Sequence, residues 1–149
     1  MNKWDKRFMD MAELVSTWTS CARQGRAIGA IIVKDKRILT TGYNGAPSGI
    51  LTCRDKGYCM RDRLGIKSGT CAEKCYAVHA EQNAITQAAR LGVSVDGATL
   101  YCTHQPCTIC TRIIINSGIK RVVYKNPYPD EFSMQLFDEA GIIVEKFEE

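Results

Sequence analysis

Two short motifs that are far apart in the chain constrain the fold most, because they must meet in space to act together. The first is H-A-E at residues 79–81, and the second is P-C-T-I-C at 106–110. One imidazole, from His79, and two thiolates, from Cys107 and Cys110, are ligands typical of zinc. Three protein ligands leave the fourth tetrahedral position open to water, which is the mark of a catalytic site. We therefore expect a fold that brings these two motifs together around one metal ion.

Both motifs are predicted to begin helices. The segment from His79 through "NAITQAAR" reads as a helix that Gly92 can cap, and Pro106 suits the first turn of a helix over 106–117. Spacing of three residues places both sulfurs on one helix face, and a helix N-terminus favours the thiolate form that binds metal. A Cys-x-x-Cys pair alone would also fit a redox dithiol. The histidine favours a metal site.

Glu81 lies two residues after His79, close enough to reach the same metal without binding it. A carboxylate in that place can take a proton from water and return it to a substrate nitrogen. The alternative is an acid that only favours the helix macrodipole. Its combination with the histidine and the paired cysteines favours the proton shuttle.

Strands alternate with helices along most of the chain, which predicts a layered α/β domain whose sheet is covered on both faces. The length of 149 residues suits one domain over 1–149. Residues 51–75 are rich in cysteine and charge but lack periodicity, and we call them the cysteine-rich insert. The expected helices are 3–20, 79–92, 106–117 and 130–141; the expected strands are 27–33, 37–43, 98–103, 120–125 and 142–147.

Eight cysteines could form a disulfide scaffold, but the start "MNKWDKRFMDMAEL" has no apolar signal-peptide core, and no segment approaches membrane-spanning length. We expect a cytoplasmic protein, in which thiols bind metal or react. The net charge of +4 suits an anionic small molecule and is too weak to indicate nucleic acid.

The segments "GYNGAPSG", "HAEQNAI", "QAAR" and "ATLYCTHQPCTIC" resemble the cytidine and deoxycytidylate deaminase superfamily, and within it the deoxycytidylate (dCMP) deaminases. The H-x-E and P-C-x-x-C pair identifies the zinc deaminases as a group. The resemblance covers residues 5 to 145. It implies a three-layer α/β/α fold with a central mixed sheet of about five strands and helices on both faces.

The resemblance also implies the reaction, which is zinc-dependent hydrolysis of dCMP to dUMP and ammonia, supplying thymidylate synthesis. His79, Cys107 and Cys110 would bind the zinc, and Glu81 would move the protons. Arg90 resembles the family arginine near the 5′-phosphate, where a guanidinium fork suits phosphate oxygens, although it also fits a solvated residue near a helix end. The other substrate-binding residues implied are Asn44 near the deoxyribose, Tyr128 near the phosphate, and the backbone at Ala80 and Cys107 near the pyrimidine.

Larger members of this family are regulated by nucleotides: dCTP with Mg²⁺ activates them and dTTP inhibits them, at sites between the subunits of a homo-oligomer that is commonly a hexamer. The corresponding residues here are Gly42, Tyr43, Asn44 and Gly45. The resemblance therefore predicts the same effectors and assembly.

Some relatives carry a second, structural zinc, and the insert lacks enough apolar residues to pack firmly without such a staple. The expected ligands are Cys21, Cys53, Cys59 and Cys75, with Cys71 as the alternate for Cys75. The alternative is that they are buried free thiols. Cys102 is expected in the core, and His104 at the pocket mouth.

Other functions remain open at this stage. A deaminase of cytidine, of tRNA adenosine or of a riboflavin precursor would share the zinc motifs. A non-catalytic, zinc-stabilised nucleotide-binding module is the alternative outside enzymes. Glu81 speaks against that alternative, because a structural zinc needs no unligated acid beside it.

Overall fold

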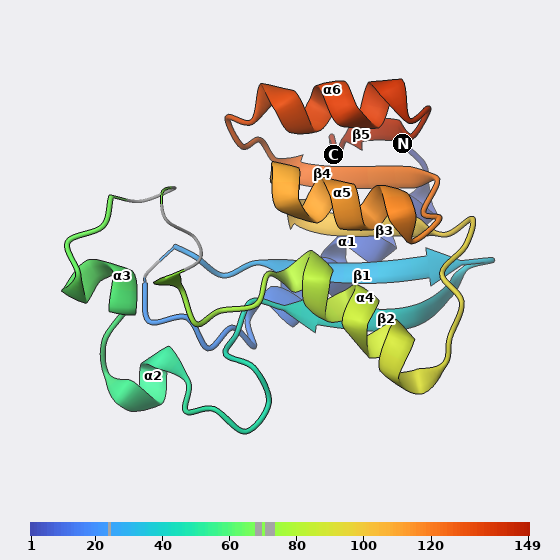
Figure 1. The fold of residues 1–149 in the computed structure, drawn as a ribbon. Coiled ribbons are helices and arrows are strands. Elements are labelled where there is room, and N and C mark those ends of the chain that lie inside the picture. Colours follow the sequence, from blue (N-terminus) through green and yellow to red (C-terminus); the bar gives the residue numbers. More distant parts are fainter. Residues whose placement is uncertain (24, 68–69, 71–73) are drawn as a thin grey trace.

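A computed structural model describes residues 1–23, 25–67, 70 and 74–149 of the chain. Its centre is a five-stranded sheet in the order β2-β1-β3-β4-β5 (Figure 1). β1 is antiparallel to both β2 and β3, whereas β3, β4 and β5 run parallel, so the predicted mixed sheet is confirmed. The strands are β1 (Gly29–Lys34), β2 (Arg37–Tyr43), β3 (Thr99–His104), β4 (Arg121–Asn126) and β5 (Ile143–Lys146).

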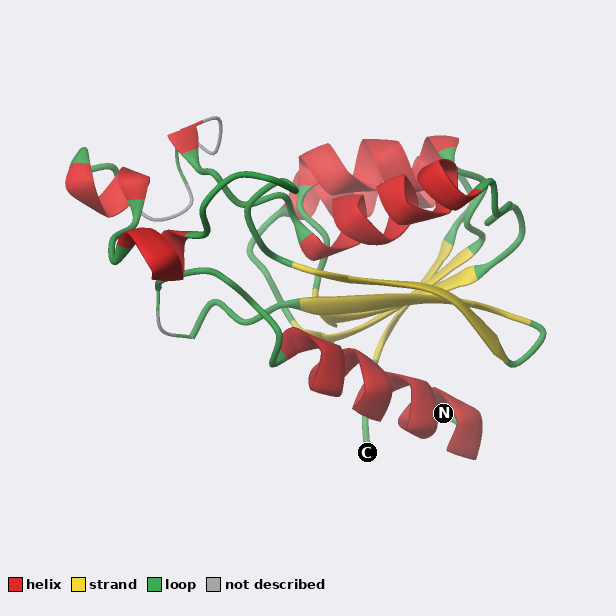
Figure 2. Cartoon of the chain, turned by 90° about the horizontal axis from the view of Figure 1, so that it is seen from below, coloured by secondary structure: helices red, strands yellow, loops and turns green. Residues whose placement is uncertain are grey.

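Helices cover both faces of the sheet, which confirms the three-layer prediction (Figure 2). α1 lies on one face, and α4, α5 and α6 lie on the other. α1 ends earlier than the predicted helix over 3–20, because the chain turns at Thr17 and continues toward β1. The helices that cover the sheet are α1 (Lys3–Ser16), α4 (Ala80–Leu91), α5 (Thr108–Asn116) and α6 (Glu131–Glu139).

The two layers of packing divide the side chains of β1 between them. Ala30 and Ile32 belong to the cluster beneath α4, α5 and α6, and Ile31 and Val33 belong to the cluster beneath α1. Side chains alternate along a strand, so a strand buried on both faces is apolar throughout. That is why "AIIV" carries no polar residue.

Two glycines allow helices to lie directly against the sheet. A Cβ on Gly42 of β2 would lie 2.1 Å from the carbonyl oxygen of Ala80 in α4. A Cβ on Gly29 of β1 would lie 2.1 Å from the carbonyl oxygen of Ala12 in α1. Backbone therefore meets backbone at both places, and Gly42 sets the position of the first turn of α4.

The cysteine-rich insert contains two short helices, α2 (Cys53–Lys56) and α3 (Met60–Arg63). Figure 1 shows both lying beyond the end of the sheet at which α4 begins. Within the described residues, no helix combines the length and the apolar character needed to cross a bilayer.

Candidate active site

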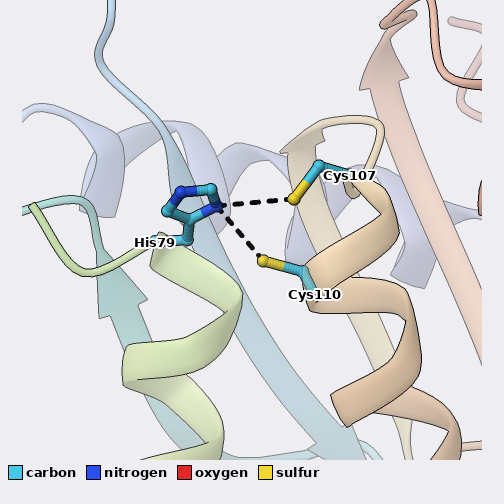
Figure 3. Close-up of side chains that lie close together, drawn as sticks. All are labelled: His79, Cys107 and Cys110. Atoms are coloured by element: carbon cyan, nitrogen blue, oxygen red, sulfur yellow. Dashed lines mark hydrogen bonds between the residues drawn. The ribbon is translucent and has the colours of Figure 1, made fainter. Parts of the chain in front are cut away.

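Three potential metal ligands meet where α4 and α5 begin (Figure 3). His79 is the N-cap residue of α4, Cys107 is the N-cap residue of α5, and Cys110 lies in the first turn of α5. β3 leads into Cys107 at its carboxyl end, the edge of an α/β sheet at which ligands ordinarily bind. The two motifs that are separate in the sequence therefore meet, as expected.

The separations of the three side chains fit one metal ion. Nδ1 of His79 lies 3.6 Å from Sγ of Cys107 and 3.3 Å from Sγ of Cys110. The three ligand atoms lie within 4.8 Å of one another. Tetrahedral zinc with ordinary Zn–S and Zn–N bonds holds its ligands about 3.5 Å apart, so the donor set and its spacing both suit zinc.

His79 is held from both sides. Its backbone N–H donates to Oε1 of Gln82 at 2.9 Å. The preceding residue, Val78, exchanges two backbone hydrogen bonds with Gly45, at 2.7 and 3.2 Å. The "GYNG" segment thus helps to position His79, because Gly42 lets α4 pack against β2 and Gly45 pairs with the residue before His79.

The electrostatic environment favours a thiolate at Cys107. A hydrogen bond from the thiol of Cys110 lowers the pKa of Cys107 to about 4, outweighing the opposing effect of burial, and His79 acts in the same direction. The same contact, together with burial, raises the pKa of Cys110. The hydrogen bond with Cys107 raises the pKa of His79. A negative sulfur beside an imidazole is a suitable start for binding a cation.

Glu81 lies in the first turn of α4 and is only 5% exposed. Burial raises the pKa of its carboxyl group. Its carboxyl group shares hydrogen bonds with the thiols of Cys110 and Cys102, and Glu81 lines the same cavity as His79. A carboxyl group whose pKa is raised holds a proton more readily than an ordinary carboxyl group and can pass it on.

The cavity beside these residues has a volume of about 550 Å³, within the range of small-molecule sites. The cavity is lined by Asn44, His104 and Tyr128, and also by Ala77 near His79 and by Thr108 next to Cys107. Burial lowers the pKa of His104, and the nearby Arg26 lowers it further.

Asn44 uses both ends of its amide on the wall of the cavity. Its Oδ1 accepts from the backbone N–H of Ile28 at 3.0 Å, and its Nδ2 donates to the carbonyl oxygen of Arg26. The side chain therefore fixes the loop before β1. Contact with a deoxyribose would be in addition to this role.

Two of the predicted substrate residues do not line this cavity. Ala80 has no exposed surface and belongs to the core beneath α4. Arg90 is exposed in the last turn of α4, about 13 Å along the helix axis from Glu81. A straight helix carries Arg90 away from the site, so this residue does not line the chain's own cavity, and its contact with a phosphate stays a prediction.

Sequence reasoning missed three cationic residues that line the cavity: Arg23, Arg26 and Arg61. Arg23 and Arg26 lie in the loop before β1, and Arg61 belongs to α3 of the insert. Neither place shows a periodic pattern. The available signal was the basic stretch "CARQGR" directly before an apolar strand.

Three cysteines of the insert lie near one another and near Cys21, which precedes the insert, but among the described residues they do not bring three ligand atoms within 4.8 Å. Burial raises the pKa of Cys53, and the nearby thiols of Cys21, Cys75 and Cys59 raise it further. Across the part of the chain that the structure describes, only His79, Cys107 and Cys110 bring three ligand atoms within 4.8 Å. Cys71, the alternate ligand, lies outside the described residues. Cys102 has no exposed surface and packs in the core.

Comparison with known proteins indicates a family that shares the two motifs of this site. The zinc-binding region of cytidine and deoxycytidylate deaminases matches residues 2–126, which include both motifs. The chain belongs to this deaminase family. Zinc is therefore the metal that the family and the His-Cys-Cys group both indicate.

Individual proteins are similar over most of the chain. ComE operon protein 2 of Bacillus subtilis (strain 168) is 40% identical, over 97% of this chain and 71% of that protein. The deoxycytidylate deaminase of Mycobacterium phage D29 is 41% identical, over 81% of this chain and 93% of that enzyme. The crystal structure of dCMP deaminase from the cyanophage S-TIM5, in complex with dCMP and dUMP, superposes with a TM-score of 0.80 at 34% identity, covering 99% of both chains.

Proposed function

We propose that this deaminase hydrolyses dCMP to dUMP and ammonia. One observation carries the proposal, namely that His79, Glu81 and Cys107 line a single cavity of nucleotide size. The similarity to a dCMP deaminase solved with dCMP and dUMP supports this choice of substrate among the aminated pyrimidines.

Nδ1 of His79 and the sulfurs of Cys107 and Cys110 would hold the zinc. When bound, zinc supplies a Lewis acid that lowers the pKa of water toward neutrality, so that a nucleophile exists at pH 7. The low pKa of Cys107 provides a negative ligand without a large cost of deprotonation.

Glu81 would carry the protons of the reaction. It would take one proton from the attacking water and deliver it to N3 of cytosine, and then take the second proton from the hydroxyl group formed at C4 and deliver it to the amino group on C4. The C4–N bond then breaks, the amine leaves as ammonia, and the water oxygen remains as the C4 carbonyl of dUMP. The raised pKa of the buried carboxyl group keeps it able to hold the proton between these steps.

Two further features belong to the proposal. The dCTP–Mg²⁺ and dTTP effectors would act near Tyr43, which is 38% exposed and stacks edge-on against Trp18, in a homo-oligomer such as a hexamer. dCMP rate curves that ignore both nucleotides would reject this regulation. A structural zinc would be held by Cys21, Cys53, Cys59 and Cys75, and metal analysis that finds one zinc per chain would reject it.

The decisive experiment is an ammonia assay of the purified, zinc-loaded protein with dCMP. Cytidine and a tRNA adenosine substrate serve as comparison substrates. Glu81→Gln keeps the shape of the side chain but removes the acid, so we expect turnover to fall roughly 10³-fold or more with zinc still bound. Absence of ammonia from dCMP, or turnover by Glu81→Gln equal to that of the native protein, would contradict the proposal.

A further inference from the structure

Asp130 bonds to the chain on both sides of the metal ligand Cys107. Its carboxylate accepts from the backbone N–H of Thr108 at 2.7 Å and from the hydroxyl group of Thr108 at 2.8 Å. Its carbonyl oxygen accepts from Nε2 of Gln105 at 3.1 Å. Only Pro106 and Cys107 lie between these two partners, so a residue that is distant in the sequence holds both ends of the segment that carries the first sulfur.

The start of α5 needs this help, because Cys107 does not cap its own helix. Cys107 is the N-cap residue, but its side chain makes no capping hydrogen bond, and its sulfur lies 3.6 Å from Nδ1 of His79. The first N–H groups of a helix have no partner within the helix. Asp130 supplies an acceptor for the first of them, at Thr108. The sulfur of Cys107 is left for a metal because another residue does the capping.

The same carboxylate caps a second helix. Oδ1 of Asp130 accepts from the backbone N–H of Ser133 in the first turn of α6, at 2.9 Å. Burial would raise the pKa of Asp130, but the hydrogen bonds from Thr108 and Ser133 outweigh it and hold the pKa below its ordinary value. Asp130 is therefore a carboxylate at neutral pH, shared between the starts of α5 and α6.

These bonds also join two parts of the cavity wall. Gln105 is only 8% exposed, and its Nε2 also reaches Oγ of Ser133 at 3.3 Å. The backbone N–H of Asp130 donates to the carbonyl oxygen of Tyr128 at 2.8 Å. Tyr128, Asp130 and Cys107 line the same cavity. The segment that carries Tyr128 is thus held against the segment that carries Cys107.

We propose that Asp130 is a positioning residue of the metal centre: by holding Thr108 it fixes the backbone from which Cys107 presents its sulfur, and so it sets the affinity for zinc and the rate of the reaction. A ligand whose backbone is already fixed loses less conformational freedom when it binds a metal. The alternative is that Asp130 only caps α6. The inference rests on the proposed function for the rate alone, because zinc binding is independent of the substrate.

Asp130→Ser separates these two roles. Serine is as good an N-cap as aspartate, so it keeps an acceptor for Ser133, but its short hydroxyl group cannot also reach Thr108. Asn2→Ala is the matched control. It removes the cap of α1, where the Asn2 side chain accepts from two backbone N–H groups, on the opposite face of the sheet (Figure 2).

Zinc affinity is measured by competition with a chromophoric chelator, and the geometry of the site by the visible absorption of the cobalt(II)-loaded protein. We expect Asp130→Ser to weaken zinc binding roughly 10- to 100-fold and to shift the cobalt bands. The kcat for dCMP should fall roughly tenfold, with KM within about threefold, because the bond from Gln105 to the backbone of residue 130 remains. Asn2→Ala should lower the urea midpoint and leave zinc affinity, cobalt spectrum and kcat as in the native protein.

Native zinc affinity and cobalt bands in Asp130→Ser would overturn the proposal and leave Asp130 as a cap of α6 alone. Equal losses of zinc affinity in Asp130→Ser and Asn2→Ala would also overturn it, because a general loss of stability would explain both.

Thr108→Val decides if Asp130→Ser does not fold. It removes the hydroxyl group that bonds to Asp130 and keeps the backbone N–H, so we expect zinc binding to weaken about threefold, the loss of one hydrogen bond. Native zinc affinity in Thr108→Val would then reject the proposal. A native protein that binds zinc but releases no ammonia from dCMP would contradict the proposed function and leave the results on zinc binding intact.

Discussion

The two sides of the cavity are built by different means. On one side, His79, Cys107 and Cys110 sit where helices begin, and those helices pack on a sheet whose central side chains have no exposed surface. On the other side, the insert offers two helices of four residues each. Hydrogen bonds join Arg54 of α2 to the backbone carbonyl oxygens of Ser20 and Cys21. A salt bridge joins Asp62 of α3 to Arg23.

This difference divides the work of the site. Chemistry requires ligand atoms placed to within a fraction of an ångström, which packed helices and strands provide. Recognition of a charged group tolerates more variation, and loops commonly supply it. The regular side therefore carries the metal ligands and Glu81, whereas the insert and the loop before β1 carry the cations.

Removing a metal ligand from the regular side should have the largest effect. Cys110→Ala removes a sulfur that is fully buried at the meeting point of α4 and α5. We expect zinc content to fall and turnover to fall roughly 10³-fold or more, because the activating metal is lost. Metal analysis and an ammonia assay measure both. Cys53→Ala, in the insert, is the control, and it should retain the catalytic zinc; equal losses in the two variants would erase the contrast between the two sides.

Close packing of the frame gives the next largest effect. Gly42→Ala and Gly29→Ala would each place a Cβ 2.1 Å from a backbone oxygen, of α4 in the first case and of α1 in the second. Each should lower the free energy of unfolding by about 3 kcal/mol or more, since backbone must move. Only Gly42→Ala displaces the first turn of α4, so only it should also weaken zinc binding by the folded protein. Equal zinc affinities in the two variants would show that the site does not depend on that contact.

Much of this frame was predictable from the sequence because its elements carry local signals. A continuous apolar run indicated β1, and Gly92 and Pro106 indicated the end of α4 and the start of α5. The two zinc-binding motifs then indicated that His79 meets Cys107 and Cys110. Arg23, Arg26 and Arg61 were missed because they lie in irregular segments, whose course depends on contacts distant in sequence. Arg90 lies on a helix that was predicted well, but a regular helix carries it away from Glu81, so it does not line the cavity.

The far face of the sheet should respond to acid independently of the site. Asp5 of α1 accepts from Tyr101 at 2.7 Å and from Arg121 at 2.8 Å. Burial would raise the pKa of Asp5, but the hydrogen bonds from Arg121, Tyr101 and Asn2 outweigh it and hold the pKa below its ordinary value. The stabilisation is therefore present at neutral pH and is lost as the pH falls below about 4.

Asp5→Asn should remove about 2 kcal/mol of stability at pH 7, and less in acid, where the native protein has already lost it. Urea titrations at several pH values measure this. Turnover per folded molecule at pH 7 should not change. A constant difference between the two proteins at every pH would show that the charge of Asp5 is not what stabilises α1.

Disturbing the insert should have a smaller and more selective effect. Cys53 is 5% exposed and lies near the other insert thiols. Cys53→Ser replaces the thiol of Cys53 by a hydroxyl group and should loosen α2 and α3. We expect the KM for dCMP to rise about fivefold with little change in kcat, because the cations at the cavity are displaced while the zinc ligands are not. A fall in kcat at unchanged KM would mean that the insert supports the chemistry after all.

The smallest effect is expected for a substitution of Arg90, which tests whether a cation on the regular side contributes to recognition. Arg90→Gln removes a guanidinium from an exposed position about 13 Å from the first turn of the helix. At that separation solvent and salt screen the charge, so kcat/KM for dCMP should change by less than about twofold in 0.15 M salt. Because α4 joins Arg90 rigidly to Glu81, the variant also tests whether charge on the regular side matters at a distance. A tenfold rise in the KM for dCMP alone would show that this arginine reaches a phosphate, in a neighbouring subunit's cavity if not in its own, and recognition would then belong to both sides.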